Sequence, residues 1–202
     1  DDPIDDLRFH KQTRKSGFEI KMIPAWRPDK AMAVDNTKNF AEYVNKLGEV
    51  AGVTISKFAD MIDALQKRHD FFAANGCRLS DHGIEEFYDE EYTDSQIEII
   101  FEKAMRCQHL SNQEIRQFKN CMLTKFAEMD FDSDWTQQYH YGAIRDNNTK
   151  MFEKLGPDTG FDSIGEFNTA RAMSRFLNHL NTEGKLTRTI LYTLNPCANE
   201  VI

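Results

Sequence analysis

The chain has 202 residues, of which 40% are hydrophobic and 29% charged, a composition typical of a globular domain with one sizeable core. Its net charge of −8, its pI of about 5.3 and the lack of any basic tract argue against nucleic acid as a partner. No apolar run approaches the roughly 18 residues of a membrane span and no signal peptide is visible, so we expect a cytoplasmic protein without membrane contact.

The cysteines also favour a reducing compartment. They are widely spaced and form no CxxC pair: Cys77, Cys107, Cys121 and Cys197. This pattern is typical of ordinary thiols in a cytoplasmic protein, not of a disulfide scaffold or a zinc ribbon.

Both ends of the sequence look cut. The chain begins at Asp1 without an initiator Met, and it stops at Ile202 directly after an apolar run and a turn. We therefore expect a segment of a longer polypeptide.

The first third of the chain predicts a helix, a strand and two more helices. Asp2-Pro3 is a typical helix start, and this helix is expected to run to about Arg14. Residues 18–24 alternate apolar and polar side chains, which predicts a strand. Residues 36–76 carry apolar side chains at helical spacing with one interruption, which predicts two helices.

The middle of the chain is mainly helical. Residues 77–80 predict a short strand, followed at once by Asp-His-Gly at 81–83. Thr93 and Ser111 are typical N-caps of two helices. Since two or three helices before the next strand exceed what a crossover needs, we predict a helical insertion at residues 84–130.

The last third returns to alternating strands and helices. Residues 135–140 predict a strand, and a short helix is expected at Thr149–Leu155. A longer helix is expected at Phe167–Leu180. Thr187–Leu194 is the clearest strand pattern in the chain.

The predicted order is α-β-α-β-α-β-α-β. Strands separated by helices pair in parallel, because each return needs a crossover. Four such strands fit part of a (β/α)8 barrel or a doubly wound sheet. No GxGxxG and no Walker motif follows a strand, which favours the barrel. The fold predicted for residues 1–202 is therefore one α/β domain, a partial (β/α)8 TIM-type barrel with a helical insertion.

Polar side chains follow the predicted strands. Going along the chain, the strand ends carry Trp26, Arg27, Asp29 and Lys30, then Asp81 and His82, then His140, Tyr141 and Arg145, and finally Asn195. In a parallel barrel these strand ends meet on one face, where active sites are built. An Arg fork suits a carboxylate or phosphate, a His can move a proton near neutral pH, and an Asp can orient a neighbour or hold a hydroxyl.

Each of these residues also has a structural interpretation. Arg27 could pair with Asp29 at the surface, His140 could be a hydrogen-bonded core histidine, and Asp81 could be a helix N-cap. Only the agreement between the strand ends favours an active site over these alternatives.

A metal site is not complete in this sequence. The six histidines are scattered, and neither HxH nor HExxH occurs. We expect no metal site built from this chain alone.

Five stretches resemble one family. They occur in this order: IPAWRPDK, FFAANGCRLSDHGI, WTQQYHYGAIRDNN, LGPDTGFDSI and TILYTLNPCANEV. Together they resemble the uronate isomerase (glucuronate isomerase) family of the amidohydrolase superfamily, and the similarity runs through nearly the whole chain.

The resemblance implies a fold and an activity. Members of this family are metal-dependent-hydrolase-like (β/α)8 barrels of more than twice this length. They interconvert D-glucuronate with D-fructuronate and D-galacturonate with D-tagaturonate by moving a proton between C2 and C1. A divalent metal, usually zinc, is held by an HxH pair and an Asp that have no counterpart in this chain.

The resemblance also assigns roles by motif. It implies that Trp26 and Arg27 of WRPDK bind substrate, with Arg27 on the carboxylate. Asp81 of SDH would line the sugar pocket, and His140 of QYH would contact the substrate and help to move the proton. The chain would span about strands three to six, so we expect it to be inactive alone and poorly stable unless it self-associates. We also expect a homo-oligomer.

Two other interpretations stay open. One is another metal-dependent hydrolase or decarboxylase of the same superfamily. The other is a non-catalytic α/β piece in which residues 84–130 mediate assembly.

Overall fold

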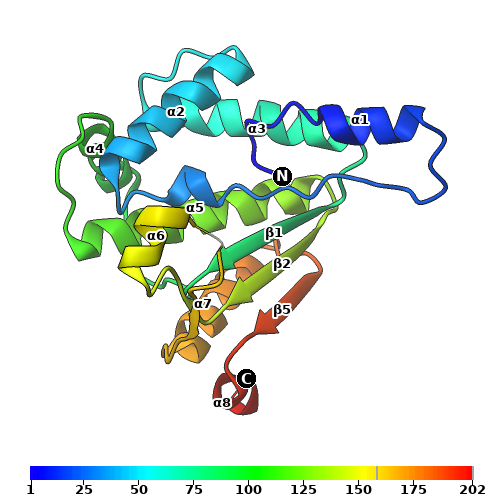
Figure 1. Cartoon of the computed structure of the whole chain (residues 1–202). Helices are drawn as coiled ribbons and strands as arrows, with labels where there is room; N and C mark the ends of the chain where they lie inside the picture. The colour runs from blue at the N-terminus through cyan, green and yellow to red at the C-terminus, as the bar shows by residue number, and fades with distance from the viewer. Residues whose placement is uncertain (158, 202) are drawn as a thin grey trace.

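The computed structural model describes residues 1–157 and 159–201. Figure 1 shows helices packed beside a small sheet, with the C-terminal helix beyond its last strand. The elements follow in chain order: α1 (Arg8–Lys15), the 3-10 helix η1 (Asp29–Met32), α2 (Thr37–Ala51), α3 (Phe58–Ala74), β1 (Leu79–Ile84), α4 (Asp94–Met105), α5 (Asn112–Asp132), β2 (Thr136–Tyr141), β3 (Ala143–Ile144), α6 (Thr149–Leu155), β4 (Ser163–Ile164), α7 (Thr169–Thr182), β5 (Thr189–Thr193) and α8 (Pro196–Val201).

The main sheet is parallel. Its strands lie in the order β1-β2-β5, and both neighbouring pairs are parallel. Helices α4 and α5 connect β1 to β2, and α6 and α7 connect β2 to β5, as parallel pairing requires. The short strands β3 and β4 form a separate antiparallel pair. The predicted mixed α/β fold with a parallel sheet is confirmed.

The strand register divides the sheet into two faces. Asp81 pairs with Gln138, and Gly83 pairs with His140, which in turn pairs with Tyr192. Because side chains alternate along a strand, these residues project from one side, which we call the open face. Every second residue of β1 and β2 is buried, so the opposite side is the helix-covered face.

Aromatic side chains fill the helix-covered face. The ring of Tyr139 from β2 lies 5.1 Å from Phe87 and 5.9 Å from Phe176 of α7. On β1, His82 stacks on the same Tyr139 ring and on Phe126 of α5. These contacts between α5, α7 and the sheet bury one face and leave the other for polar groups.

Several predicted boundaries are confirmed. Strand β2 and helix α6 lie where the pattern placed them, and Thr93 and Ser111 are N-caps with full capping boxes. Residues 84–130 hold α4 and most of α5, and their status as an insertion stays a prediction. In the described part of the chain no helix is long and apolar enough to cross a membrane.

The predicted strand at residues 18–24 is wrong. Phe18 and Ile20 are exposed, and in the described residues this segment joins no strand. Only Trp26 reaches the sheet, through one parallel bridge to Ser80. Alternation alone does not make a strand, because an extended segment also needs a neighbour to satisfy its backbone groups. The sheet therefore has three strands and one bridge, where four strands were predicted.

Two helix and strand boundaries differ from the predicted ones. Helix α1 begins at Arg8 instead of Pro3, because aspartates 2, 5 and 6 accept hydrogen bonds from backbone N–H groups two residues later and form turns. Strand β1 begins at Leu79 and runs to Ile84. Asp81 and His82 thus lie inside the strand and not after it.

The capping box of α5 gives a stability test. Ser111 accepts a hydrogen bond from the Glu114 N–H, and the Glu114 carboxylate accepts from Ser111 in return. Ser111→Ala should lower the free energy of unfolding by about 1 kcal/mol, measured by urea denaturation. Ser174→Ala, the same change on the exposed side of α7, should be neutral or slightly stabilising. Equal losses in both variants would contradict the capping argument.

Candidate active site

Asp81 lies at the centre of a charged group on the open face. Its Oδ2 is 3.8 Å from Arg27 Nη1, and its Oδ1 is 2.6 Å from His140 Nδ1. The contact with His140 lacks hydrogen-bond alignment, so Oδ1 is buried without a hydrogen-bond partner in the described residues. Buried carboxylate oxygens are normally paired, and His140 Nδ1 is a polar atom within reach of this one.

Arg27 is oriented by Asp29, two residues later at the start of η1. The Arg27 Nε–H donates to Asp29 Oδ2 at 3.3 Å. The same oxygen accepts from the Gly83 N–H at 2.8 Å, and Oδ1 lies 3.2 Å from His82 Nδ1. Burial alone would raise the pKa of Asp29. The hydrogen bond with His82, the Gly83 N–H and the charge of Arg27 outweigh this and hold the pKa below its usual value of 3.8.

Gly83 forms the floor beneath two guanidinium groups. A Cβ atom at this position would overlap Arg27 Nη2 and would lie 3.4 Å from Arg145 Nη2. Arg145 is in turn held by Asp162, whose Oδ2 accepts from its Nη1 at 2.6 Å. None of the described residues accepts a hydrogen bond from either Nη2 group, so two free cationic donors share the space above Gly83. Such an arrangement suits a carboxylate.

The His140 ring is held by β5. It stacks on Tyr192 with ring centroids 4.4 Å apart and nearly parallel planes. Tyr192 donates to the side chain of Gln138 at 3.0 Å, which fixes the aromatic ring against β2. The side chain of His140 is 43% exposed. It is therefore not a core histidine, and it can meet a ligand on the open face.

A cavity of about 580 Å³ opens beside Arg27, and neither Asp81 nor His140 lines it. Arg27, Gly83 and Arg145 line it, together with Lys30 and Lys119. The two lysines are engaged by carboxylates, Lys119 with Asp35 at 2.7 Å and Lys30 with Asp2 at 3.2 Å. The volume suits a small ligand, and the Nη2 groups of the two arginines are hydrogen-bond donors without an acceptor in the described residues.

The predicted site residues do not all meet. The structure brings Arg27, Asp81 and His140 together, with Arg145 above Gly83. Trp26 lies elsewhere: it is fully buried, with its ring against His69 and Phe72, and its substrate contact stays a prediction.

Of the two structural alternatives for Arg27 and Asp81, the one for Arg27 is partly right. Arg27 does pair with Asp29, as the structural interpretation proposed, but it also reaches Asp81. Asp81 caps no helix, because it lies inside β1.

Sequence reasoning missed the groups that support these side chains. Asp29 and His82 were placed at the strand ends without a supporting role, and Gly83 and Tyr192 were given no role. The WRPDK and SDHGI stretches contain the first three, but their contact joins residues 53 and 54 positions apart. For Tyr192, the pairing with His140 depends on the register between β2 and β5, which a single sequence does not supply.

The described residues contain no group of three or more His, Cys, Asp or Glu side chains that could hold a metal ion. The donor set around Asp81 therefore does not form a metal site by itself.

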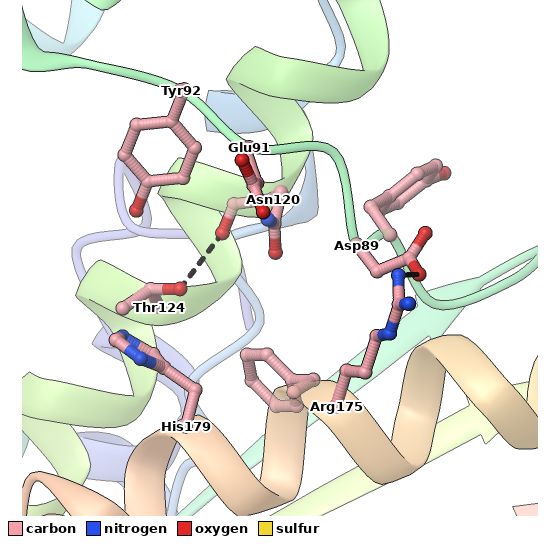
Figure 2. A pocket seen from close by; sticks show the side chains of 9 residues that line it. Asp89, Glu91, Tyr92, Asn120, Thr124, Arg175 and His179 are labelled. Atoms are coloured by element: carbon pink, nitrogen blue, oxygen red, sulfur yellow. Dashed lines mark hydrogen bonds and ion pairs between the residues drawn. The ribbon is translucent and has the colours of Figure 1, made fainter.

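A second cavity, of about 660 Å³, lies between residues 88–92, α5 and α7. Figure 2 shows its lining, in which Arg175 of α7 donates to Asp89 at 2.6 Å. Neither Arg27, Asp81 nor His140 lines it. The Arg175–Asp89 pair therefore offers a matched control for arginine–carboxylate pairs at the candidate site.

The fold and the site define an α/β protein with arginine, aspartate and histidine side chains gathered on the open face of a parallel sheet. A family model described as glucuronate isomerase matches residues 1–202, and the chain belongs to this family, as its motifs predicted. It is 68% identical over its whole length to the uronate isomerase of Bacteroides thetaiotaomicron and 48% identical to that of Cellvibrio japonicus. It spans 43% of the length of each of these relatives.

Solved structures agree. The chain is similar over its whole length to the uronate isomerase from Thermotoga maritima, with a TM-score of 0.93 and 34% identity, and it covers 44% of that chain. It is also similar to the glucuronate isomerase from Caulobacter crescentus, with a TM-score of 0.86 and 25% identity, over 96% of this chain and 40% of the other. The arrangement of helices and sheet therefore recurs within larger proteins.

The lowered pKa of Asp29 gives a pH test. Its ionised form stabilises the folded chain fully above the unfolded pKa of about 3.8, and this contribution is lost as pH falls through the lower folded pKa. Asp29→Asn should lower the free energy of unfolding by about 1–3 kcal/mol at pH 7, with a difference from the parent that shrinks below pH 3.8.

Urea denaturation at several pH values measures this difference. Asp63→Asn is the control, because Asp63 is exposed and makes no ion pair in the described part of the chain. A difference for Asp29→Asn that stays constant down to pH 2 would contradict the argument.

Proposed function

We propose that the chain is the part of a uronate isomerase that binds the sugar acid and supplies one acid–base pair. The reaction is the interconversion of D-glucuronate with D-fructuronate and of D-galacturonate with D-tagaturonate, in hexuronate catabolism. Family membership supports this proposal, and so does the match to relatives named uronate isomerase.

One observation carries the proposal. Asp81 contacts both Arg27 and His140, so a carboxylate-binding group and a proton-transfer group lie on either side of one acid. A hexuronate carries its carboxylate at one end and its reacting C1 and C2 atoms at the other. Groups of both kinds on one sheet face suit a substrate with these two ends.

In the proposed mechanism Arg27 binds the substrate carboxylate, with Arg145 as a second donor above Gly83. Asp81 accepts a sugar hydroxyl through its carboxylate, which is 21% exposed. His140 takes part in moving the proton between C2 and C1, its ring held in orientation by Tyr192. A histidine is suited to this role because it gains and loses a proton near neutral pH.

We further propose that the sheet is part of a (β/α)8 barrel and supplies about strands three to six. Helical crossovers between its strands and the match to the Thermotoga maritima enzyme support this. The divalent metal of the proposed enzyme, zinc in this hypothesis, would be held by other residues, because the donor set described here does not fit a metal. No step is assigned to it.

A cytoplasmic location is proposed on the cysteines. Cys77 and Cys121 are buried and Cys107 and Cys197 exposed, and all four are free thiols. A homo-oligomer is proposed on exposed apolar side chains such as Phe18 and Ile20. Sedimentation velocity of a full-length chain tests the oligomer, which a purely monomeric species would exclude.

The activity is tested in a full-length chain. We define the grafted enzyme as the Bacteroides thetaiotaomicron uronate isomerase in which these 202 residues replace the matching segment. It should convert D-glucuronate or D-galacturonate to the ketose, with exchange of the C2 proton followed by NMR in heavy water. A folded, metal-loaded grafted enzyme that turns over neither sugar acid would contradict the proposed function.

Arg27→Met should raise KM about 10- to 100-fold in the grafted enzyme, because a charge-assisted pair with the substrate carboxylate is lost. His140→Asn should lower kcat by about 10²- to 10⁴-fold with a smaller effect on KM. Steady-state kinetics separates the two effects.

Arg175→Met is the control for both variants. Arg175 also pairs with a carboxylate at 2.6 Å, but it lies at the second cavity. It should leave both constants within about twofold of the parent. If Arg27→Met behaves like this control, Arg27 does not bind the carboxylate.

Gly83→Ala should also raise KM, because the added Cβ would overlap Arg27 Nη2 and displace the guanidinium. The flexible side chain can move, so the loss of stability should be small. Gly184→Ala should lower the stability and leave KM unchanged. Gly184 follows α7 with a φ of 68°, which disfavours a side chain, and it does not belong to the candidate site. The melting temperature and KM of both variants are measured to check this contrast. An unchanged KM in Gly83→Ala would contradict the role of Gly83.

A further inference from the structure

His82 reaches the candidate site without facing it. Its side chain is fully buried on the helix-covered face, between the rings of Phe126 and Tyr139. The ring planes differ by only 16° and 18° from those of its two neighbours. Packed rings on both sides fix the plane of the imidazole, and its Nδ1 edge faces Asp29.

The Nδ1 atom carries the proton in this contact. A carboxylate is only an acceptor, so Nδ1–H donates to Asp29 Oδ1 at 3.2 Å. The Gly83 N–H holds the other oxygen at 2.8 Å. Asp29 is thus held at both oxygens by groups of β1 and cannot rotate freely.

The held carboxylate determines where Arg27 lies. Its Oδ2 also accepts from the Arg27 Nε–H, which places the Nη2 group over Gly83. Arg27 itself is 47% exposed and would otherwise be mobile. The chain of contacts therefore runs from a buried ring through a carboxylate to an exposed guanidinium.

We propose that His82 is a positioning residue for Arg27 and acts through Asp29. The inference rests on the proposed carboxylate-binding role of Arg27 and extends it to a residue that never meets the substrate. It predicts that the N–H donor of His82, and not its ring, decides how well the sugar acid binds.

Two substitutions at position 82 separate donor from ring. His82→Phe keeps an aromatic ring between Phe126 and Tyr139 but removes the donor. His82→Asn loses the ring, while its amide nitrogen takes the place of Nδ1 and still donates. In the grafted enzyme, His82→Phe should raise KM about 5- to 30-fold. His82→Asn should keep KM within about twofold of the parent although its Tm falls, because the stacked ring is lost.

A second buried histidine provides the matched control. His69 is fully buried, lies 3.3 Å from Asp130 and stacks on Trp135 at 3.8 Å. Among the described contacts, neither His69 nor Asp130 pairs with Arg27. His69→Phe should lower Tm and leave KM within about twofold of the parent. Equal rises of KM in His69→Phe and His82→Phe would show a general structural effect and overturn the proposal.

A double-mutant cycle tests the route through Arg27. In an Arg27→Met background, His82→Phe should raise KM no further, because the side chain that it positions is gone. A full additional rise there would overturn the proposal.

A crystal structure of the His82→Phe grafted enzyme gives a readout that does not depend on turnover. Arg27 Nε should no longer lie within hydrogen-bond distance of Asp29, whereas His82→Asn should keep this contact. An unmoved Arg27 in His82→Phe would overturn the positioning role even if the enzyme is an isomerase. A parent without turnover would instead remove the proposed function and leave this structural test standing.

Discussion

Parallel pairing of β1 with β2 is the constraint on which the site depends. It places Asp81 beside Gln138 and Gly83 beside His140, so that a carboxylate, a glycine without a side chain and a histidine share one face. A shift of one residue would turn these side chains to the helix-covered face. The aromatic packing of Tyr139 against α7 opposes such a shift, because it needs Tyr139 to point inward. Core packing and site geometry are thus two results of one register.

The two faces of β1 carry different chemistry. Ser80 and His82 point inward and each pairs with a carboxylate, Asp130 for the first and Asp29 for the second. Asp81 between them points outward, toward Arg27 and His140. Buried polar groups that are paired hold neighbouring elements in place, while charged groups on the open face are placed to meet a ligand.

Local signals were sufficient for most helices and for β2. Thr93 and Ser111 are followed three residues later by Gln and Glu, so each capping box can be recognised within four consecutive positions of the sequence. Residues 18–24 show where local signals fail. Their alternation is as regular as that of a strand, but a strand also needs a partner, and alternation does not say whether one exists.

The sequence by itself determined the family, the alternation of helices with β1, β2 and β5, and the choice of Arg27, Asp81 and His140 as candidates, because these signals lie in short continuous motifs. Only the tertiary structure decided that Trp26 is buried, that His140 stacks on Tyr192, and that His82 reaches Arg27 through Asp29. These outcomes depend on strand register and on contacts between residues about 50 positions apart. No periodicity or motif in a single chain encodes such distances, because they arise only when separate elements pack together.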